Sequence, residues 1–380
     1  MNISYVSVFD ASDIKSGSGT DYYIPKAMIA QSANVTYISK LEKRNRFYHK
    51  GKEWLYKKLR NEKYLIDRSP SVLKGYAEQI KKRAEGIKTD VFLSYSSIPV
   101  TFLDAGAPVI FWADANFADM IDYYPYFTNL SEETIRNGNL MEKQSIHNAA
   151  YAVYSSEWAR QGAIKHYGAD PDKVKVIPYG ANIDNDYTIE DIKDLVNSKS
   201  KEVCKLLFIG VEWYRKGGKK AVEIVKYLNE NGIKAELSIV GIEPDDGEEL
   251  PDYVKVYGFI SKKTAEGKKL LEDLISGSHF LVLPTLADCT PIVYCEFSSF
   301  GIPSITNDTG GVSSVVADNI NGKLFKVGSP AEQYGDYIIS MFTDQKKYMD
   351  MALSSFNEYK TRLNWDYAGR KMKELIETLM

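Results

Sequence analysis

The sequence predicts an α/β protein made of two open parallel-sheet domains that face each other across a cleft. Short runs of β-branched and aromatic residues alternate with longer mixed segments along the chain of 380 residues, a pattern typical of parallel strands joined by helices. This length exceeds the roughly 250–300 residues at which one hydrophobic core stops growing. A polar, acidic stretch over residues 181–202 separates two series of strands and is interpreted as a linker with one short helix. Ligands of such sheets bind beyond the carboxyl ends of the strands, which places the expected site in the cleft.

Each predicted strand is a short apolar run that ends at a polar or glycine-containing turn. In the first series these runs are Ile3–Phe9, Val35–Ser39, Val91–Tyr95, Val109–Trp112, Tyr151–Ser155 and Val174–Pro178. In the second series they are Lys205–Ile209, Glu236–Val240, Val254–Tyr257, Phe280–Leu283 and Ser304–Thr306. We therefore expect an N-terminal domain over residues 1–182, a linker over 183–203, a C-terminal domain over 204–360, and a helix over 361–380 that returns to the N-terminal domain.

Composition excludes several classes of protein. The 48 Lys and Arg residues against 51 Asp and Glu residues give a net charge of −3, which disfavours a nucleic-acid partner. Three cysteines without C-x-x-C spacing and four scattered histidines do not form a zinc site and suit a reducing compartment. We see neither a secretory signal nor a membrane-spanning run. The expectation is a cytoplasmic protein.

Two acidic residues belong to a predicted helix and the loop before it, directly after a predicted strand. Asp288 precedes this helix and Glu296 lies two turns inside it. Thr290 is the expected N-cap, Pro291 fits the first turn, and Gly301 ends a helix of about ten residues. The unpaired N–H groups at such a helix start attract an anion. The alternative is that Asp288 is a loop carboxylate and that Glu296 pairs with a neighbouring base.

Four motifs in order resemble the family 4 glycosyltransferases, whose GT-B fold consists of two Rossmann-like domains facing across a cleft. The motifs cover most of the chain and are residues 154–158, residues 167–182, residues 208–217, and residues 288–311 with the acidic pair. Two positions depart from the family. Asp288 stands where Glu is usual, so its reach to the sugar is shorter, and Val211 stands where an Arg is frequent. Arg215 is the candidate that replaces this charge.

The resemblance implies a retaining, hexosyltransferase-type enzyme of polysaccharide or glycoconjugate synthesis. It would move a sugar from a UDP- or GDP-sugar to a hydroxyl of a glycan or lipid-linked acceptor, without a metal or other cofactor. The Asp184-Asn185-Asp186 run falls in the predicted linker and is not expected to bind a metal. By family correspondence Glu296 holds the donor ribose and Asp288 the transferred sugar. The remaining donor-side residues are Phe259 and Ile260 at the base and Thr290, Pro291, Ile292 and Val293 at the helix start.

Two basic residues follow the strand that opens the second domain. Arg215 and Lys216 precede two glycines and a predicted helix. Guanidinium and ammonium groups both suit phosphate oxygens, and glycine allows close approach of the backbone. Taken alone, such a pair is more often solvated surface. The resemblance assigns both residues to the charge of the leaving diphosphate.

Two loops of the first domain complete the predicted site. Gly17 and Gly19 follow the first strand, but Tyr22 breaks the dinucleotide fingerprint G-x-G-x-x-G, which argues against a nicotinamide enzyme. In the family a glycine loop here lies near the donor phosphates; the alternative is a plain turn. Asp114 sits where family members often have a histidine. It is either a cleft carboxylate or a helix N-cap.

The most uneven charge lies in residues 40–63. Ten Lys and Arg residues against three Glu residues give this segment a net charge of +7. Aromatic and leucine side chains are interleaved with the charges, a composition that suits an anionic bilayer surface. We expect this segment to bring the enzyme to the inner membrane leaflet. The alternative is a solvated basic helix that packs on its own domain.

Two other functions stay open at this stage. The departures at Asp288 and Val211 are consistent with a catalytically silent partner subunit of a glycosyltransferase complex. A nucleotide-sugar epimerase shares the fold and needs no separate acceptor. Donor hydrolysis separates the enzyme from the silent partner, and product identity separates the transferase from the epimerase.

Overall fold

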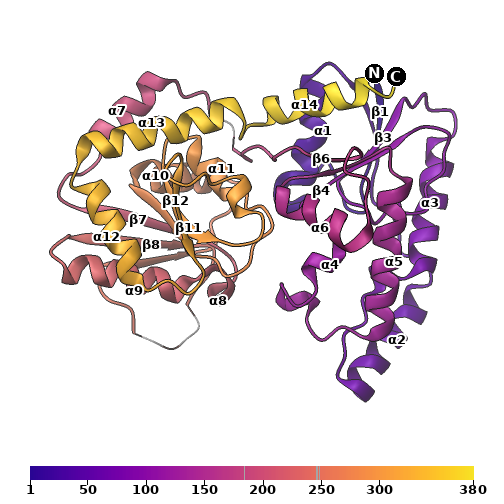
Figure 1. The fold of residues 1–380 in the computed structure, drawn as a ribbon, viewed down its shortest axis with the longest axis horizontal. Helices are drawn as coiled ribbons and strands as arrows, with labels where there is room; N and C mark the ends of the chain where they lie inside the picture. Colours follow the sequence, from indigo (N-terminus) through magenta and orange to yellow (C-terminus); the bar gives the residue numbers. More distant parts are fainter. Residues whose placement is uncertain (184, 245–246, 248) are drawn as a thin grey trace. The chain divides into compact units, whose positions relative to one another are not determined.

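A computed structural model describes residues 1–183, 185–244, 247 and 249–380 (Figure 1). The chain divides into unit 1, residues 1–179 with 365–380, and unit 2, residues 180–364. Among the described residues each unit contains one six-stranded sheet, and the paired strands run parallel. The predicted α/β class with two open parallel sheets is confirmed.

The sheet of unit 1 has the strand order β2-β1-β3-β4-β5-β6. Its strands are β1 (Asn2–Val6), β2 (Asn34–Ile38), β3 (Val91–Ser94), β4 (Val109–Ala113), β5 (Tyr151–Tyr154) and β6 (Val174–Val176). The central strands β3 and β4 are buried along their whole length because helices cover both faces. Sequence reasoning placed the end of β1 three residues too late: residues 7–9 leave the sheet and form a loop at its carboxyl edge.

Helices of unit 1 connect successive strands (Figure 1). They are α1 (Thr20–Ala30), α2 (Arg46–Arg60), α3 (Pro70–Ala84), α4 (Phe117–Met120), α5 (Glu132–Asn148) and α6 (Glu157–Tyr167), with the short 3₁₀ helices η1 (Ser16–Gly19), η2 (Ile66–Arg68) and η3 (Pro125–Phe127). Ser131 caps α5 and Ser156 caps α6 by accepting hydrogen bonds from backbone N–H groups. Serine side chains thus fix where both helices begin.

The C-terminal helix α14 (Trp365–Glu377) belongs to unit 1 and packs against α1. Trp365 stacks on Tyr23 with ring centroids 5.9 Å apart. A Cβ atom at Gly369 would lie 2.9 Å from the carbonyl oxygen of Ala27, so glycine permits the close approach of the two helices. The chain therefore ends on the domain with which it begins.

Unit 2 has the strand order β12-β11-β10-β7-β8-β9. Its strands are β7 (Cys204–Ile209), β8 (Ala235–Val240), β9 (Val254–Gly258), β10 (Phe280–Leu283), β11 (Ser304–Asp308) and β12 (Gly322–Lys326). Its helices are α7 (Ile189–Ser198), α8 (Trp213–Lys216), α9 (Gly218–Glu230), α10 (Ala265–Gly277), α11 (Val293–Ser298), α12 (Ala331–Phe342) and α13 (Gln345–Thr361), with the 3₁₀ helix η4 (Val312–Ser314). Sequence reasoning missed the edge strand β12, because Gly-Lys-Leu-Phe-Lys lacks the β-branched residues that mark a strand.

The structure includes residues 183–203, the expected linker, in unit 2. Its helix α7 belongs to unit 2, and Ile192 and Val196 of that helix lie in the hydrophobic core of this unit. A capping box between Thr188 and Asp191 starts the helix. The polar composition of the segment hid an apolar face that tertiary packing buries. Asp184 of the Asp184-Asn185-Asp186 run lies outside the described residues.

His279, directly before β10, is a buried histidine held in its neutral form. Its Nδ1 accepts a hydrogen bond from the backbone N–H of Lys205 (3.0 Å), and its Nε2 lies 2.9 Å from the carbonyl oxygen of Ser200. Burial lowers the pKa of His279 from 6.5 to about 4. Protonating Nδ1 would break the bond to Lys205, so the folded state resists the charge.

We expect unit 2 to lose stability as the pH falls from about 6.5 to 4. In this window the unfolded chain binds a proton at His279 that the folded chain excludes, so the free energy of unfolding falls by up to about 3 kcal/mol. Urea unfolding monitored at several pH values measures this slope. The variant His279→Asn keeps an acceptor for Lys205 and should unfold with a shallower pH dependence; an unchanged slope would contradict the assignment to His279.

Candidate functional site

The turn after β7 places two predicted cations against the loop after β10. Trp213, at the start of α8, is buried and contacts Phe208 of β7, which anchors the turn. Gly217 has φ +78°, and a Cβ atom there would lie 2.2 Å from the carbonyl oxygen of Pro284. Only glycine allows this contact, so Gly217 sets the position of Arg215 and Lys216 beside the loop that carries Asp288.

Lys216, Arg215 and Asp288 form a buried charge cluster. The Nζ of Lys216 lies 2.5 Å from Oδ2 of Asp288, and Nη1 of Arg215 lies 3.4 Å from Oδ1. Asp288 is 5% exposed, and both basic side chains are largely buried. Thr285 donates its hydroxyl to Asp288 at 3.2 Å. Asp288 lies 72 positions after Lys216 and 73 after Arg215 in the sequence, and the three residues meet at the carboxyl ends of β7 and β10.

Arg215 also holds the loop itself. Its Nη1 donates to the carbonyl oxygen of Ala287 at 2.7 Å, and its own carbonyl accepts the N–H of Leu286 at 2.7 Å. Glu212, on the solvent side, pairs with its Nε. The guanidinium group is therefore part of the loop scaffold, whereas the Lys216 ammonium is a point charge at the carboxylate.

Glu296 pairs with a base that sequence reasoning did not single out. Its Oε1 lies 2.7 Å from Nζ of Lys262, and Glu296 itself is buried on α11. This is the contact that the alternative interpretation of Glu296 anticipated. Lys262 follows β9 in the run Ser261-Lys262-Lys263, just after the predicted base-pocket turn. A basic run next to a predicted ligand turn was the signal available in the sequence.

The helix that carries Glu296 is shorter than predicted. It begins at Val293 rather than after Thr290, and its N-cap is Ile292, with no side-chain cap. Gly301, at φ +65°, turns the chain after the helix as expected. With six residues, α11 provides a weaker dipole than the predicted ten-residue helix.

The residues predicted at the base pocket differ in exposure. Phe259 is 72% exposed, whereas Ile260 packs against the core of unit 2. Gly258, at φ +61°, ends β9 and turns the chain at this point. Val211 and Tyr214, beside the cations, are also exposed apolar side chains. The exposed rings of Phe259 and Tyr214 are flat, which suits stacking on a planar base.

In unit 1 the glycine loop forms η1 and the start of α1. Gly17 has φ +53°, and a Cβ atom there would lie 2.8 Å from the ring of Tyr95. Gly19 has φ +96° and precedes the first residue of α1. Asp21, in the first turn, is buried and accepts hydrogen bonds from Tyr5 (2.7 Å) and Ser7 (2.6 Å), and burial raises its pKa. The loop is a tight, glycine-dependent turn at the carboxyl end of β1.

Asp114 follows β4 and is exposed. The neighbouring helix α4 takes its N-cap from Asn116, whose side chain accepts the N–H of Asp119. The interpretation of Asp114 as an N-cap is therefore wrong, because the helix starts two residues later. Asp114, Gly17 and Gly19 belong to unit 1, and the other predicted site residues belong to unit 2.

No group of three or more His, Cys, Asp or Glu side chains within the described ranges is placed to hold a metal ion. Across the same ranges, no helix combines the length and apolarity that crossing a bilayer requires. The three cysteines are buried, and none of them forms a disulfide within the described ranges.

A comparison with protein families assigns most of unit 2 to a known class of domain. Residues 190–357, most of unit 2, match the family model described as glycosyl transferases group 1. This part of the chain is a glycosyl transferases group 1 domain. It contains both acidic residues and both cations of the site.

One curated relative is itself a glycosyltransferase. The UDP-Gal:alpha-D-GlcNAc-diphosphoundecaprenol alpha-1,3-galactosyltransferase of Escherichia coli is 24% identical over 56% of this chain and 56% of its own length. The chain spans about half the length of the curated relatives it matches.

The structural likenesses concern the fold and extend over both units. Sucrose-phosphate synthase from Thermosynechococcus elongatus has a TM-score of 0.70 at 15% identity, covering 100% of this chain and 99% of that one. Anabaena HepE, solved in complex with UDP, has a TM-score of 0.64 at 13% identity, covering 100% of both chains. The protein has the GT-B fold, as the resemblance predicted.

Proposed function

We propose that the protein is a glycosyltransferase that moves a sugar from a nucleotide diphosphate-sugar to a hydroxyl of a glycan or lipid-linked acceptor. The observation that carries the proposal is the buried cluster of Lys216, Arg215 and Asp288 within the glycosyl transferases group 1 domain. The relative that acts on a diphosphoundecaprenol-linked sugar supports a role in cell-surface polysaccharide synthesis. The solved UDP complex of a protein with the same fold supports a UDP-sugar donor, with a GDP-sugar as the other candidate.

The charge of the cluster suits departure of a nucleoside diphosphate. When the bond between the anomeric carbon and the diphosphate oxygen breaks, the electron pair stays on the diphosphate. The acceptor oxygen bonds to the anomeric carbon and passes its proton to the departing diphosphate. Lys216 and Arg215 are fixed before the reaction, and preorganised cations stabilise charge that develops in the transition state. Retention of configuration, hexosyl transfer without a metal, and membership in family 4 are parts of this proposal that rest on the motif resemblance.

The remaining roles follow the same proposal. Glu296 would bind the donor ribose, Asp288 the transferred sugar, and Phe259 with Ile260 the base. Thr290 and the following residues up to Val293 would lie along the donor. In unit 1, the loop of Gly17 and Gly19 would approach the donor phosphates, and Asp114 would hydrogen-bond the sugar.

A donor screen tests the function. The purified full chain is incubated with UDP- and GDP-sugars, and its melting temperature and the release of nucleoside diphosphate are measured with and without EDTA. A donor added at a concentration of 100 times its Kd stabilises the folded state by about 2.7 kcal/mol. Binding without release or transfer would favour a silent partner subunit, and an epimerised donor would favour the epimerase. Loss of turnover in EDTA would remove metal independence from the proposal.

The basic segment 40–63 supports a cytoplasmic enzyme that docks on an anionic membrane surface. Its helix α2 exposes Phe47 (92%) and Leu59 (75%), and among the residues of α2, all of which are described, His49 alone is buried. Lys52 and Tyr56 attach the helix to Glu133 of α5. The alternative of a helix that packs on its own domain accounts for these attachments and leaves the exposed apolar side chains uncovered.

We expect the protein to sediment with anionic liposomes at low salt and to stay in the supernatant at high salt. Each Lys or Arg near the surface contributes about 1 kcal/mol, so Lys57→Ala with Lys58→Ala should lower the partition coefficient roughly 10- to 30-fold. The matched control replaces Lys81 and Lys82, two exposed lysines on α3 outside the segment, and should bind like the parent. Equal recovery in the supernatant under all conditions would exclude the membrane role.

A further inference from the structure

Asn307, in β11, binds the loop that follows β10. In the parallel register, Leu283 of β10 pairs with Thr306 of β11. Asn307 therefore comes level with Pro284, one residue past the end of β10. Its Nδ2 donates hydrogen bonds to the carbonyl oxygens of Pro284 (3.1 Å) and Thr285 (2.9 Å). A side-chain amide thus binds the loop at the point where the backbone pairing of the two strands ends.

Tyr334 of α12 fixes the orientation of the Asn307 amide. Its hydroxyl donates to Oδ1 of Asn307, and both residues are buried. A carbonyl oxygen only accepts hydrogen bonds, so the amide nitrogen must face the loop and the amide oxygen must face Tyr334. The ring of Tyr334 stacks on Phe325 of β12 with centroids 4.1 Å apart, which holds the hydroxyl in place. Burial raises the pKa of Tyr334 to about 12, so the hydroxyl keeps the proton that it donates.

Thr285 connects this contact to Asp288. The Thr285 hydroxyl lies 3.2 Å from Oδ2 of Asp288 and 3.1 Å from the carbonyl oxygen of Arg215. In the sheet, β10 lies between β11 and β7. Asn307 therefore holds the loop from the side of β11, while Arg215 and Lys216 contact it from the side of β7. The position of Asp288 depends on both sides.

The two carbonyl oxygens bound by Asn307 would be costly to leave without a partner. Pro284, Thr285 and Asn307 are buried, so water does not replace a lost hydrogen bond at this point. Without Asn307 the loop would have to shift to reach other donors. Because Asp288 lies 2.5 Å from the Lys216 ammonium group, such a shift changes the geometry of the charge cluster. A displacement of about 1 Å at a reacting group can lower an enzymatic rate roughly 10²-fold.

We propose that Asn307, oriented by Tyr334, is a positioning residue for sugar transfer: it holds the loop after β10 so that Asp288 and Lys216 keep the arrangement that the reaction requires. This role rests on the proposed function. Asn307 and Tyr334 act through the loop and do not contact the donor. Their loss therefore lowers turnover more than nucleotide affinity, because the proposed contacts to the base and the ribose lie outside this loop.

Two variants of the full chain test this role. Asn307→Leu keeps the size of the side chain and removes both hydrogen bonds to the loop, so turnover at saturating donor should fall roughly 10- to 100-fold. Tyr334→Phe removes only the hydroxyl that orients the amide, and a fall of roughly 5-fold is expected, the scale of one hydrogen bond. UMP or GMP, which carries the base and the ribose of the donor, should bind both variants like the parent. A purely structural role would lower the melting temperature and leave the turnover of the folded fraction unchanged.

Hydrogen–deuterium exchange measures the loop without any ligand. The backbone N–H of Leu286 donates to the carbonyl oxygen of Arg215 at 2.7 Å, so its exchange reports whether the loop keeps its place against the turn after β7. We expect this N–H group to exchange faster in Asn307→Leu than in the parent. Tyr334→Phe should show the same change to a lesser degree.

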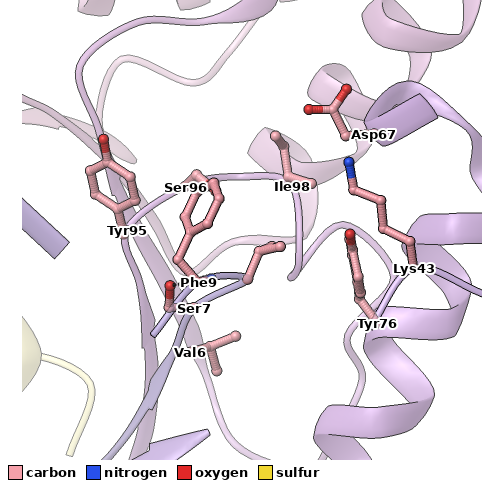
Figure 2. A pocket seen from close by; sticks show the side chains of 10 residues that line it. Val6, Ser7, Phe9, Lys43, Asp67, Tyr76, Tyr95, Ser96 and Ile98 are labelled. Carbon is pink, nitrogen blue, oxygen red and sulfur yellow. Dashed lines mark hydrogen bonds between the residues drawn. The ribbon is translucent and has the colours of Figure 1, made fainter. Parts of the chain in front are cut away.

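Two tyrosines whose buried hydroxyls have no hydrogen-bond partner in the described part of the chain serve as matched controls. Tyr337 lies three residues after Tyr334 on α12. Tyr76 belongs to α3 of unit 1 and lines a small pocket there (Figure 2). Tyr337→Phe and Tyr76→Phe should keep parental turnover and parental exchange, because neither variant removes a hydrogen bond that supports the loop. If Asn307→Leu does not fold, the comparison of Tyr334→Phe with Tyr337→Phe decides.

Three results would overturn the positioning role while the transferase stands. Parental exchange at Leu286 in Asn307→Leu would mean that Asn307 does not hold the loop. Faster exchange with parental turnover would mean that the place of the loop does not limit transfer. Equal losses in Tyr334→Phe and Tyr337→Phe would assign the effect to α12 as a whole. If the parent neither binds nor turns over a donor, the proposed function fails, and exchange at Leu286 still decides whether Asn307 holds the loop.

Discussion

Replacing Lys216 by alanine is expected to lower turnover by roughly 10²-fold or more, the scale of losing one preorganised charge-stabilising group. In the structure its ammonium group lies 2.5 Å from Asp288, at the carboxyl edge of the sheet. The variant removes one of the two cations that the described structure places at Asp288, so the leaving diphosphate loses part of the positive charge that it would meet. Turnover at saturating donor, measured as nucleoside diphosphate release or sugar transfer, checks this expectation.

Two companion variants show whether the loss belongs to Lys216. Lys220→Ala removes a lysine of α9 that pairs with Glu223, and it should keep parental turnover. Arg215→Ala should disturb the loop through the lost bond to Ala287, and it should lower the melting temperature more than Lys216→Ala does. If the Arg215 variant alone lost activity, the two residues would exchange roles. Full activity of both variants would contradict the proposed charge cluster.

Replacing Glu296 by glutamine is expected to weaken donor binding by about 1–3 kcal/mol, which corresponds to roughly 5- to 150-fold in Kd. The substitution keeps the shape of the side chain and removes the charge that would accept hydrogen bonds from the ribose hydroxyls. Since Lys262 is partly exposed, it can turn to water when its partner becomes neutral. The fold should therefore stay intact. Isothermal titration with the donor identified in the screen measures the change.

Lys262 supplies the decisive control, because its pairing with Glu296 is the competing explanation. Lys262→Met removes the same ion pair and leaves the Glu296 carboxylate in place. If Glu296 binds the ribose, the Lys262 variant retains donor affinity better than Glu296→Gln. Equal affinity of parent and Glu296→Gln, together with equal losses of stability in both variants, would reduce Glu296 to a structural ion-pair partner.

Local patterns in the sequence were sufficient to predict most of the fold. All eleven predicted strands are present within a few residues. The central strands β3 and β4 were readable as short apolar runs because helices bury both of their faces. The turn chemistry was equally readable: Gly301 has the positive φ expected after a helix, and Gly217 allows the contact between the turn after β7 and the loop after β10. Two features escaped: the edge strand β12, which lacks β-branched residues, and the burial of α7 in unit 2, because the short helix expected in this segment was assigned to a linker.

For the site, the sequence by itself determined which residue types occur in which loops: two cations after β7, a carboxylate after β10 and another on the following helix. Tertiary structure alone decided which of them meet. Asp288 binds Lys216 because the parallel order of β10 beside β7 brings their carboxyl ends together, although 72 positions separate the residues. The same packing gave Glu296 its partner Lys262. Spacing along a chain specifies neighbours within a helix or strand, whereas contacts across a sheet depend on strand order, and no local pattern encodes that order.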